Sequence, residues 1–184
     1  MKKMFLLLIA VAIYVPTAVA SDKFLGLFPR HKGVAPVTDA KYAESCGECH
    51  FAYQPGLLPA RSWQKLLDPK QLEDHFGENA ELPEMDRVAV LQFLTKYSAD
   101  STIRYKRSIK IRRSLDDDAV PLRITEVPYI KKKHDEIPRK MIQDNRQVRS
   151  LSYCNKCHTE AAKGVFDDDT VDIPNFPDWE DEVD

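Results

Sequence analysis

The chain has 184 residues, of which 30% are charged, and its formal net charge at pH 7 is −2. This length suits one domain or two small lobes, and the weakly acidic balance argues against a partner that is a nucleic acid.

Residues 1–20 are expected to form a secretory signal peptide. Lys2 and Lys3 provide a positive start, residues 4–15 form an apolar run, and residues 18–20 read Ala-Val-Ala, a typical cleavage site. The apolar run is shorter than the roughly 20 residues that a membrane-spanning helix needs. We expect cleavage after Ala20 and export to the periplasm; a retained amphipathic anchor is the alternative.

Two Cys-x-x-Cys-His motifs, at residues 46–50 and 154–158, contain all four cysteines. This spacing is typical of covalent c-type haem attachment, in which both thiols add to the haem vinyl groups and the histidine binds the iron. Export agrees with this chemistry, because bacteria attach c-type haem in the periplasm. The motifs predict two haem c groups, bound through Cys46, Cys49, Cys154 and Cys157, with His50 and His158 as proximal iron ligands.

Three other uses of the cysteines explain less. A four-thiolate zinc site usually places its two pairs roughly 15–20 residues apart, and here more than a hundred residues separate them. A thioredoxin-like centre needs one pair on a βαβ frame that the pattern does not show. Disulfides fit an oxidising compartment. None of the three accounts for a histidine directly after each pair.

Residues 21–100 predict an N-terminal helical haem lobe. Short helices are expected over residues 41–50 and 61–67, separated by a Pro/Gly-rich turn. Asp68 and Pro69 are a helix-start pattern, and the helix they open is expected to carry Leu72, His75 and Phe76 on one face until Gly77. A further helix is expected from Pro83, with an apolar stripe of Met85, Val88, Leu91, Leu94 and Tyr97.

Residues 101–184 predict a second lobe of another kind. Ile109 and Ile111 alternate with basic residues, and Leu122 and Ile124 repeat the alternation beyond an acidic turn at 116–118, so a two-stranded ribbon is expected. A helical pattern returns over residues 138–155, and residues 167–184 look like an extended acidic tail. The predicted fold is therefore mainly α with a small β ribbon, in two lobes.

Charge is unevenly distributed within this second lobe. Basic residues outnumber acidic ones over 101–149, and the reverse holds over 160–184. Separated charges of this kind steer encounters between redox proteins. Alternatively, the acidic tail folds back onto the basic segment.

The sixth position of each haem iron needs a second ligand. His75, about 25 residues beyond His50, and His134, 24 residues before His158, are the candidates. Met85 and Met141 are alternatives, and a methionine ligand would raise the reduction potential. His31 lies between Arg30 and Lys32 and is expected to be a solvated loop residue.

The chain resembles the periplasmic dihaem cytochromes c of the DHC family. The resemblance covers nearly the whole exported chain. It is carried by residues 44–63 (ESCGECHFAYQPGLLPARSW), 75–77 (HFG) with Ala80 and Leu82, 134–138 (HDEIP), 154–158 (CNKCH), 164–168 (GVFDD) and 173–174 (IP). It implies a class I cytochrome c-like N-terminal lobe, an irregular second lobe, and two bis-histidine haems, with His50 paired to His75 and His158 to His134. It further implies a role in electron transfer, from a membrane cytochrome b to a monohaem oxygen-binding cytochrome of the sphaeroides haem protein type.

Two six-coordinate haems would accept and pass electrons but would not readily bind a substrate at iron. The expected function is therefore a periplasmic electron carrier, monomeric and not an enzyme. The alternative is a dihaem peroxidase or small-molecule reductase with one switchable haem; a haem-based sensor is a third reading, for which no signalling segment is visible.

Overall fold

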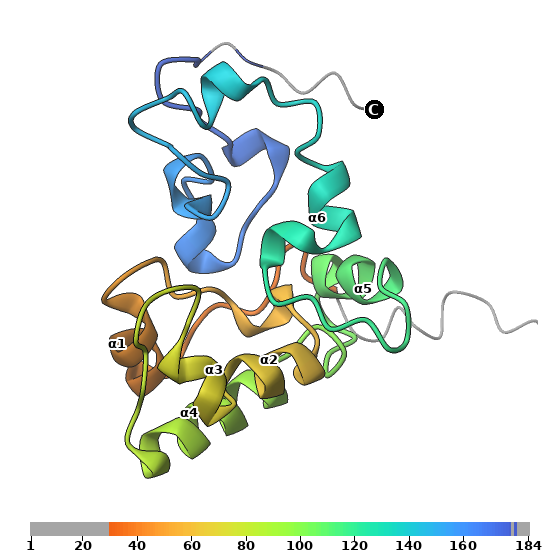
Figure 1. Ribbon diagram of the computed structural model, residues 1–184. Coiled ribbons are helices and arrows are strands. Elements are labelled where there is room, and N and C mark those ends of the chain that lie inside the picture. The colour runs from red at the N-terminus through yellow and green to blue at the C-terminus, as the bar shows by residue number, and fades with distance from the viewer. Residues whose placement is uncertain (1–29, 178, 180–184) are drawn as a thin grey trace, which may run out of the picture.

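The computed structural model describes residues 30–177 and 179. The predicted signal peptide and the end of the acidic tail lie outside these residues. The described chain is mainly helical (Figure 1), with the helices α1 (Ala40–Gly47), α2 (Ala60–Leu66), α3 (Pro69–Glu73), α4 (Glu84–Lys96), α5 (Lys106–Arg113) and α6 (Pro128–Lys132). Single 3₁₀ turns connect them at Pro55–Leu57, Ile124–Glu126, Arg139–Met141, Cys154–Lys156, Ala161–Lys163 and Asp168–Thr170.

Aspartate side chains begin two helices of the N-terminal half, and the start predicted at Asp68 and Pro69 is confirmed. The Asp39 carboxylate accepts the backbone N–H of Tyr42 at 2.8 Å and begins α1. The Asp68 carboxylate accepts the N–H of Lys70 at 3.1 Å and begins α3, with Pro69 in its first position. Both aspartates satisfy N–H groups that the helix itself leaves unpaired.

The apolar stripe predicted for α4 is partly wrong. Val90 and Leu94 are fully buried, whereas Met85 is 84% exposed and Val88 and Tyr97 are also exposed. With 3.6 residues per turn, two neighbouring stripes of this helix both contain apolar side chains. The packing of α4 against α2 and α1 decides which stripe is buried.

The predicted β ribbon is wrong. Residues 106–113 form α5, and Ile124 lies in a 3₁₀ turn. Within the described residues, β pairing is limited to isolated bridges. The helix buries Ser108, Ile109 and Ile111, and the Lys and Arg residues among them are good helix formers.

The helix predicted over residues 138–155 is also wrong. A 3₁₀ turn at Arg139–Met141 is followed by irregular backbone. Buried Asn145 holds this path: its amide donates to the Pro174 carbonyl at 2.7 Å, and its carbonyl oxygen accepts the N–H of Gln147 at 3.1 Å. Side chain to backbone hydrogen bonds of this kind compete with helix formation.

Two apolar clusters form the interior. The larger contains Leu57, Trp63 and Leu94 from the N-terminal half together with Ile111 and Phe166 from the C-terminal half, so it is continuous across residue 100. The smaller contains Met141, Ile142, Val148 and Ile173. In Figure 1, α1–α4 lie below the irregular segments after α6. The boundary at residue 100 stays a prediction.

The acidic segment after Phe166 folds back onto basic residues. The Asp167 carboxylate lies 3.5 Å from the Lys32 ammonium and 3.5 Å from the Arg107 guanidinium. Asp168 pairs with Lys133 at 3.9 Å. In the described part of the tail, the alternative is therefore confirmed: acidic residues of the tail pair with basic residues of the same chain.

None of the helices in the described part of the chain combines the length and the apolar character required to cross a bilayer.

Gly164 joins the two halves at a point where no side chain fits. Its φ is +76°, its carbonyl accepts the N–H of Val34 at 2.9 Å, and a Cβ on it would overlap the Val34 carbonyl oxygen. Gly77 has a φ of +102° with open space around it. We expect Gly77→Ala to lower the free energy of unfolding by about 1–2 kcal/mol through backbone strain alone.

In Gly164→Ala the new Cβ would also overlap the Val34 carbonyl oxygen. We expect this overlap to lower the free energy of unfolding by a further amount of about 1–3 kcal/mol. Denaturant unfolding of the haem-loaded variants measures both. Equal losses for the two variants would contradict the close approach at Gly164.

Candidate functional site

The first attachment motif lies at the end of α1. Cys46 is in the helix, Cys49 is exposed just beyond it, and His50 follows in a turn. The His50 Nδ1 lies 2.8 Å from the Phe51 carbonyl oxygen, the distance of a hydrogen bond that Nδ1–H would donate. That bond would leave Nε2 as the free lone pair of the ring.

His75 faces His50 across this site, although it does not lie on a helix as predicted. α3 ends at Glu73, and the chain turns through positive φ values of +60° at Phe76 and +102° at Gly77. The His75 N–H donates to the Glu78 carbonyl at 2.7 Å, which closes this turn. The two imidazole centroids are 6.4 Å apart with an interplanar angle of 23°.

The surroundings of His75 favour a neutral imidazole. Burial lowers its pKa from the ordinary value, and the nearby His50 and Arg123 lower it further. Its Nδ1 is buried without a hydrogen-bond partner. The Arg123 guanidinium lies 4.0 Å from the ring centroid of Phe76, next to this histidine.

The second attachment motif lies in irregular backbone. Cys154 begins a 3₁₀ turn, and the N–H of His158 donates to the Cys154 carbonyl at 2.9 Å. The chain around residues 171–172 runs back alongside this motif. The Asp172 N–H donates to the Cys157 carbonyl at 2.8 Å, and Val171 pairs with His158 in an isolated bridge. These contacts place His158 against Phe166, with ring centroids 5.2 Å apart.

His134 faces His158 from just beyond α6. The two ring centroids are 6.0 Å apart with an interplanar angle of 75°. The His134 Nδ1 lies 2.7 Å from the Ile130 carbonyl oxygen, so it is placed to donate as His50 is. Burial, together with His134 and Arg107, lowers the pKa of His158 to about 4 despite an opposing effect of Asp168. His158 is therefore neutral at neutral pH, the form that binds metals.

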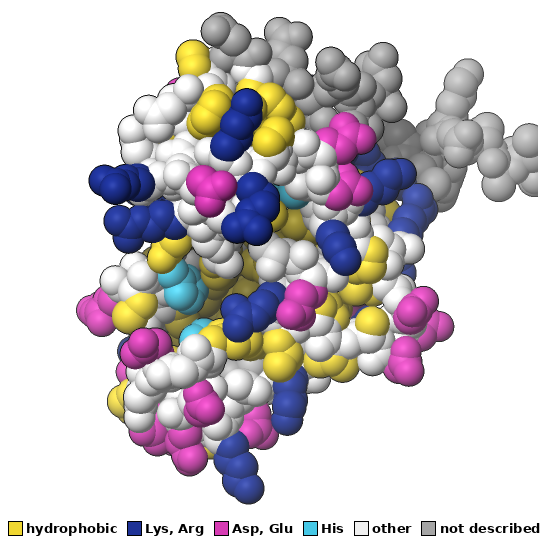
Figure 2. Space-filling model, turned by 45° about the horizontal axis from the view of Figure 1, so that its top comes forward, with side chains coloured by type: hydrophobic (Ala, Val, Ile, Leu, Met, Phe, Trp, Pro, Cys, Tyr) yellow, Lys and Arg dark blue, Asp and Glu magenta, His cyan; other side chains and the backbone are white. Residues whose placement is uncertain are grey.

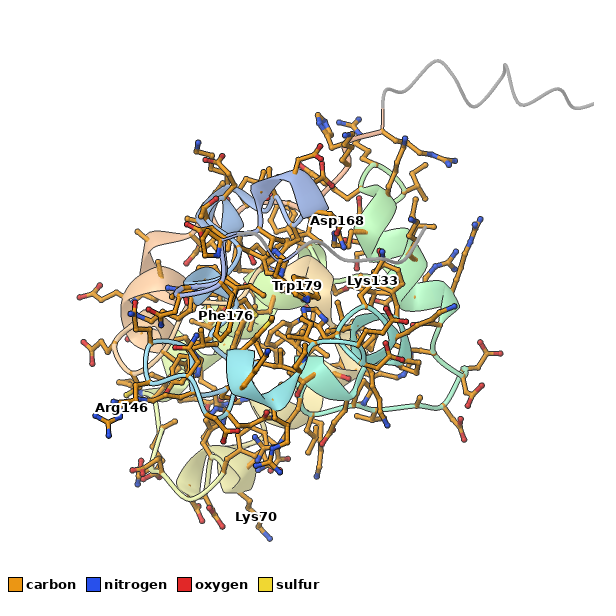
Figure 3. The ribbon with its side chains drawn as sticks, turned by 90° about the horizontal axis from the view of Figure 1, so that it is seen from above. Lys70, Lys133, Arg146, Asp168, Phe176 and Trp179 are labelled. Carbon is orange, nitrogen blue, oxygen red and sulfur yellow. The ribbon has the colours of Figure 1, made fainter. Side chains whose placement is uncertain are left out.

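A cavity of about 600 Å³ surrounds the second histidine pair. Pockets for molecules of cofactor size span roughly 300–1,000 Å³. Lys133, Asp168 and Trp179 belong to its lining and lie close together in Figure 3. On the face drawn in Figure 2, histidine side chains border a hollow with apolar walls. The lining includes His134, Cys154, Cys157 and His158 together with the apolar side chains Ile130, Ile137, Ile142, Val148, Leu151, Phe166 and Ile173.

The residues present fit covalently bound haem. Each site combines two free thiols with two opposed imidazoles. Burial raises the pKa values of Cys46 and Cys154 to about 11, so these thiols stay protonated at neutral pH. One imidazole of each pair also has a buried Nδ1 without a partner, at His75 and His158. Such groups are rare unless another ligand completes the site.

The alternative residues are placed less well for binding iron. Met85 is exposed on α4, and Met141 is buried in the smaller apolar cluster but does not line the cavity. His31 is exposed, as predicted, and stacks on Tyr105. In the described part of the chain, no three His, Cys, Asp or Glu side chains gather as a metal cluster, and none of the four cysteines forms a disulfide.

Two residues near these sites were not identified from the sequence. Arg107 lines the second cavity, where its guanidinium donates to the Phe166 carbonyl at 2.6 Å. Tyr53 lies against His50, with ring centroids 5.0 Å apart. Arg107 gave no signal of its own within a basic segment, and Tyr53 appeared only as part of the resemblance to DHC.

Comparisons with known proteins show the family of this chain. The family model described as dihaem cytochrome c matches residues 42–166. A solved diheme cytochrome c from Shewanella baltica OS155 is 39% identical, with a TM-score of 0.61, and covers 77% of this chain and 97% of its own. A diheme cytochrome c from Rhodobacter sphaeroides is 40% identical, with a TM-score of 0.63, and covers 72% of this chain and 100% of its own. No match was found among curated proteins.

The family match extends over most of the chain and includes both attachment motifs. The fold, the four cysteines and the family model lead to one assignment. This chain belongs to the dihaem cytochrome c family, which implies two covalently bound haem c groups and a role in electron transfer.

Proposed function

We propose that this chain is a periplasmic electron carrier whose irons are each bound by two histidines, His50 with His75 and His158 with His134. The spacing of the histidine rings carries the proposal. Two metal–imidazole bonds of about 2 Å each place the centroids of opposed rings about 6 Å apart. The two pairs lie 6.4 and 6.0 Å apart, which leaves room for one iron between the rings of each pair.

The protein contributes orientation and exclusion of other ligands. When bound, haem c supplies reversible one-electron chemistry. Nδ1–H bonds from His50 and His134 to the backbone carbonyls of Phe51 and Ile130 would fix each ring and leave its Nε2 free to bind iron. A histidine on both sides leaves no position for a substrate, and this ligand set keeps the potential below that of a His/Met cytochrome c.

We extend the proposal to the redox partners. The family resemblance supports a membrane cytochrome b as donor and a soluble monohaem oxygen-binding cytochrome as acceptor. Exposed basic residues such as Lys131, Lys132 and Arg146 favour an acidic docking face on one partner. We expect electron transfer to the acceptor to slow as salt concentration rises, measured by stopped-flow mixing. Rates that do not change with ionic strength would contradict electrostatic steering.

Carbon monoxide distinguishes a carrier from an enzyme. With two histidines on each iron, the dithionite-reduced protein is expected to keep its absorption spectrum when carbon monoxide is added. A dihaem peroxidase or reductase needs one open or switchable iron and would show a rapid spectral shift. Such a shift in the native protein would overturn the proposal of two closed haems.

A further inference from the structure

Arg107 is the least exposed charged side chain among the described residues that line the second cavity. It belongs to α5, and its side chain is 13% exposed. The other cations of the lining are Lys131, which is exposed, and Lys133, which is 30% exposed and lies 3.9 Å from the Asp168 carboxylate. A buried charge is costly unless it is paired and hydrogen-bonded. Arg107 is therefore the lining residue whose charge most needs an anion.

The protein contacts of Arg107 leave its charge and one of its donors incompletely satisfied. One terminal nitrogen donates to the Phe166 carbonyl at 2.6 Å, and the other donates to the Tyr129 hydroxyl at 3.2 Å. The Asp167 carboxylate lies 3.5 Å from Arg107 and also 3.5 Å from the Lys32 ammonium, so it serves two cations. Within the described residues, the Arg107 Nε is buried without a hydrogen-bond partner. A carboxylate from a bound group would supply both the missing acceptor and the missing negative charge.

Arg107 also holds part of the wall of the second site. Phe166, whose carbonyl it binds, packs its ring against that of His158, with centroids 5.2 Å apart. The group that the second motif binds carries the required anions, because each haem has two propionates, and a guanidinium recognises carboxylates in a planar, two-donor geometry. Arg107 thus supports the proximal histidine through Phe166 and lines the space that a haem bound at Cys154 and Cys157 would fill.

We propose that Arg107 is a positioning residue of the second haem site, which pairs with a haem propionate, holds Phe166 against His158 and raises the reduction potential of this haem. The oxidised haem carries one positive charge more than the reduced haem, so a fixed cation in a poorly solvated site disfavours oxidation. Arg123, the arginine beside Phe76 at the first site, is 50% exposed, so water screens its charge more strongly. Arg107 therefore contributes to a difference in potential between the two haems.

The test is a spectroelectrochemical titration of the haem-loaded protein. Arg107→Gln removes the charge, and we expect reduction of the second haem to become about tenfold less favourable, which lowers its potential by about 59 mV. Arg107→Lys keeps the charge without the planar fork, and a smaller change of about threefold is expected. The first haem is expected to keep its potential in both variants. Lys110→Gln is the matched control, because Lys110 is exposed on the same helix and does not line the cavity.

A purely structural role of Arg107 predicts a different result. The propionate bending bands in the resonance Raman spectrum respond to hydrogen bonding, and we expect them to shift in both Arg107 variants but not in Lys110→Gln. Arg107 variants that unfold at lower temperature but keep the native potential and the native propionate bands would overturn the proposal. So would an equal change of both haems, or an equal change in Lys110→Gln. If Arg107→Gln does not take up haem, Arg107→Lys decides by the same two measurements.

The role of Arg107 rests on the proposed function, because it concerns the potential of a haem that exchanges electrons, but it does not depend on which residue is the second ligand. If the unaltered protein binds carbon monoxide, the proposal of two closed haems fails whatever Arg107 does. If it does not bind carbon monoxide and the Arg107 variants keep the native potential, only the role of Arg107 fails.

Discussion

Replacement of His134 by alanine is expected to open the second site, so that one of the two haems binds carbon monoxide after reduction. The imidazole of His134 is placed 6.0 Å, centroid to centroid, from that of His158. Within the cavity lining, the substitution removes the ring that faces His158 and leaves both cysteines of the second motif in place. The change is measured as a shift of about half of the Soret absorption, and His75→Ala is expected to do the same at the first site.

The matched control is His31→Ala, which removes an exposed histidine stacked on Tyr105 and belonging to neither pair. It is expected to leave the spectrum unchanged. His134→Met tests the same position differently: a methionine ligand is expected to raise the potential of one haem only. If His134→Ala stays unreactive toward carbon monoxide, His134 is not the ligand and the pairing at the second site is wrong.

Removing both cysteines of the second motif, Cys154→Ala with Cys157→Ala, is expected to halve the haem content and to unfold the region around it. A cavity of about 600 Å³ would then be empty. At roughly 24 cal/mol per Å³ this costs about 14 kcal/mol, as much as the whole stability of a typical domain, about 5–15 kcal/mol. The cavity would therefore not persist, and the irregular segments that line it would lose their packing.

The matched variant changes the first motif, Cys46→Ala with Cys49→Ala. This site lies at the end of α1, α4 packs against both α1 and α2, and none of these three helices contributes to the large cavity. Hydrogen exchange is expected to show lost protection over residues 134–177 in the second-motif variant and a smaller, local loss in the first-motif variant. Haem per chain is measured as the pyridine haemochrome. Equal and small losses of protection in the two double variants would contradict the prediction that folding of residues 134–177 depends on the second haem.

The errors of the sequence-based prediction lie mainly in residues 101–155. Ile109 and Ile111 fit a strand, but residues 106–113 form α5, which buries Ser108, Ile109 and Ile111 and places Ile111 in the larger cluster. The predicted helix over 138–155 fails because Asn145 bonds to backbone rather than allowing a helix to pass through it. In both cases contacts with residues distant in sequence override local propensity. For residues 138–155 the contact is the bond from Asn145 to Pro174, 29 positions away.

The placement of His75 illustrates the same limit at the site. The sequence suggested a helical face shared with Leu72, yet α3 ends at Glu73 and positive φ at Phe76 and Gly77 turns the chain. His75 still faces His50. The predicted helical face was one argument for His75 and is wrong, whereas the interval from His50 and the small number of histidines do not depend on secondary structure.

The sequence by itself determined the chemistry of this protein: two attachment motifs that use every cysteine, and two further histidines at matching intervals. Covalent haem attachment depends on residues that are adjacent in the chain, so a linear pattern is sufficient to reveal it. Only the tertiary structure decided how the sites relate to each other. The hydrogen bond from Tyr53 to Ser152 and the lining of the second cavity by Phe166 and Trp179 arise from packing between residues distant in sequence, which local patterns do not encode.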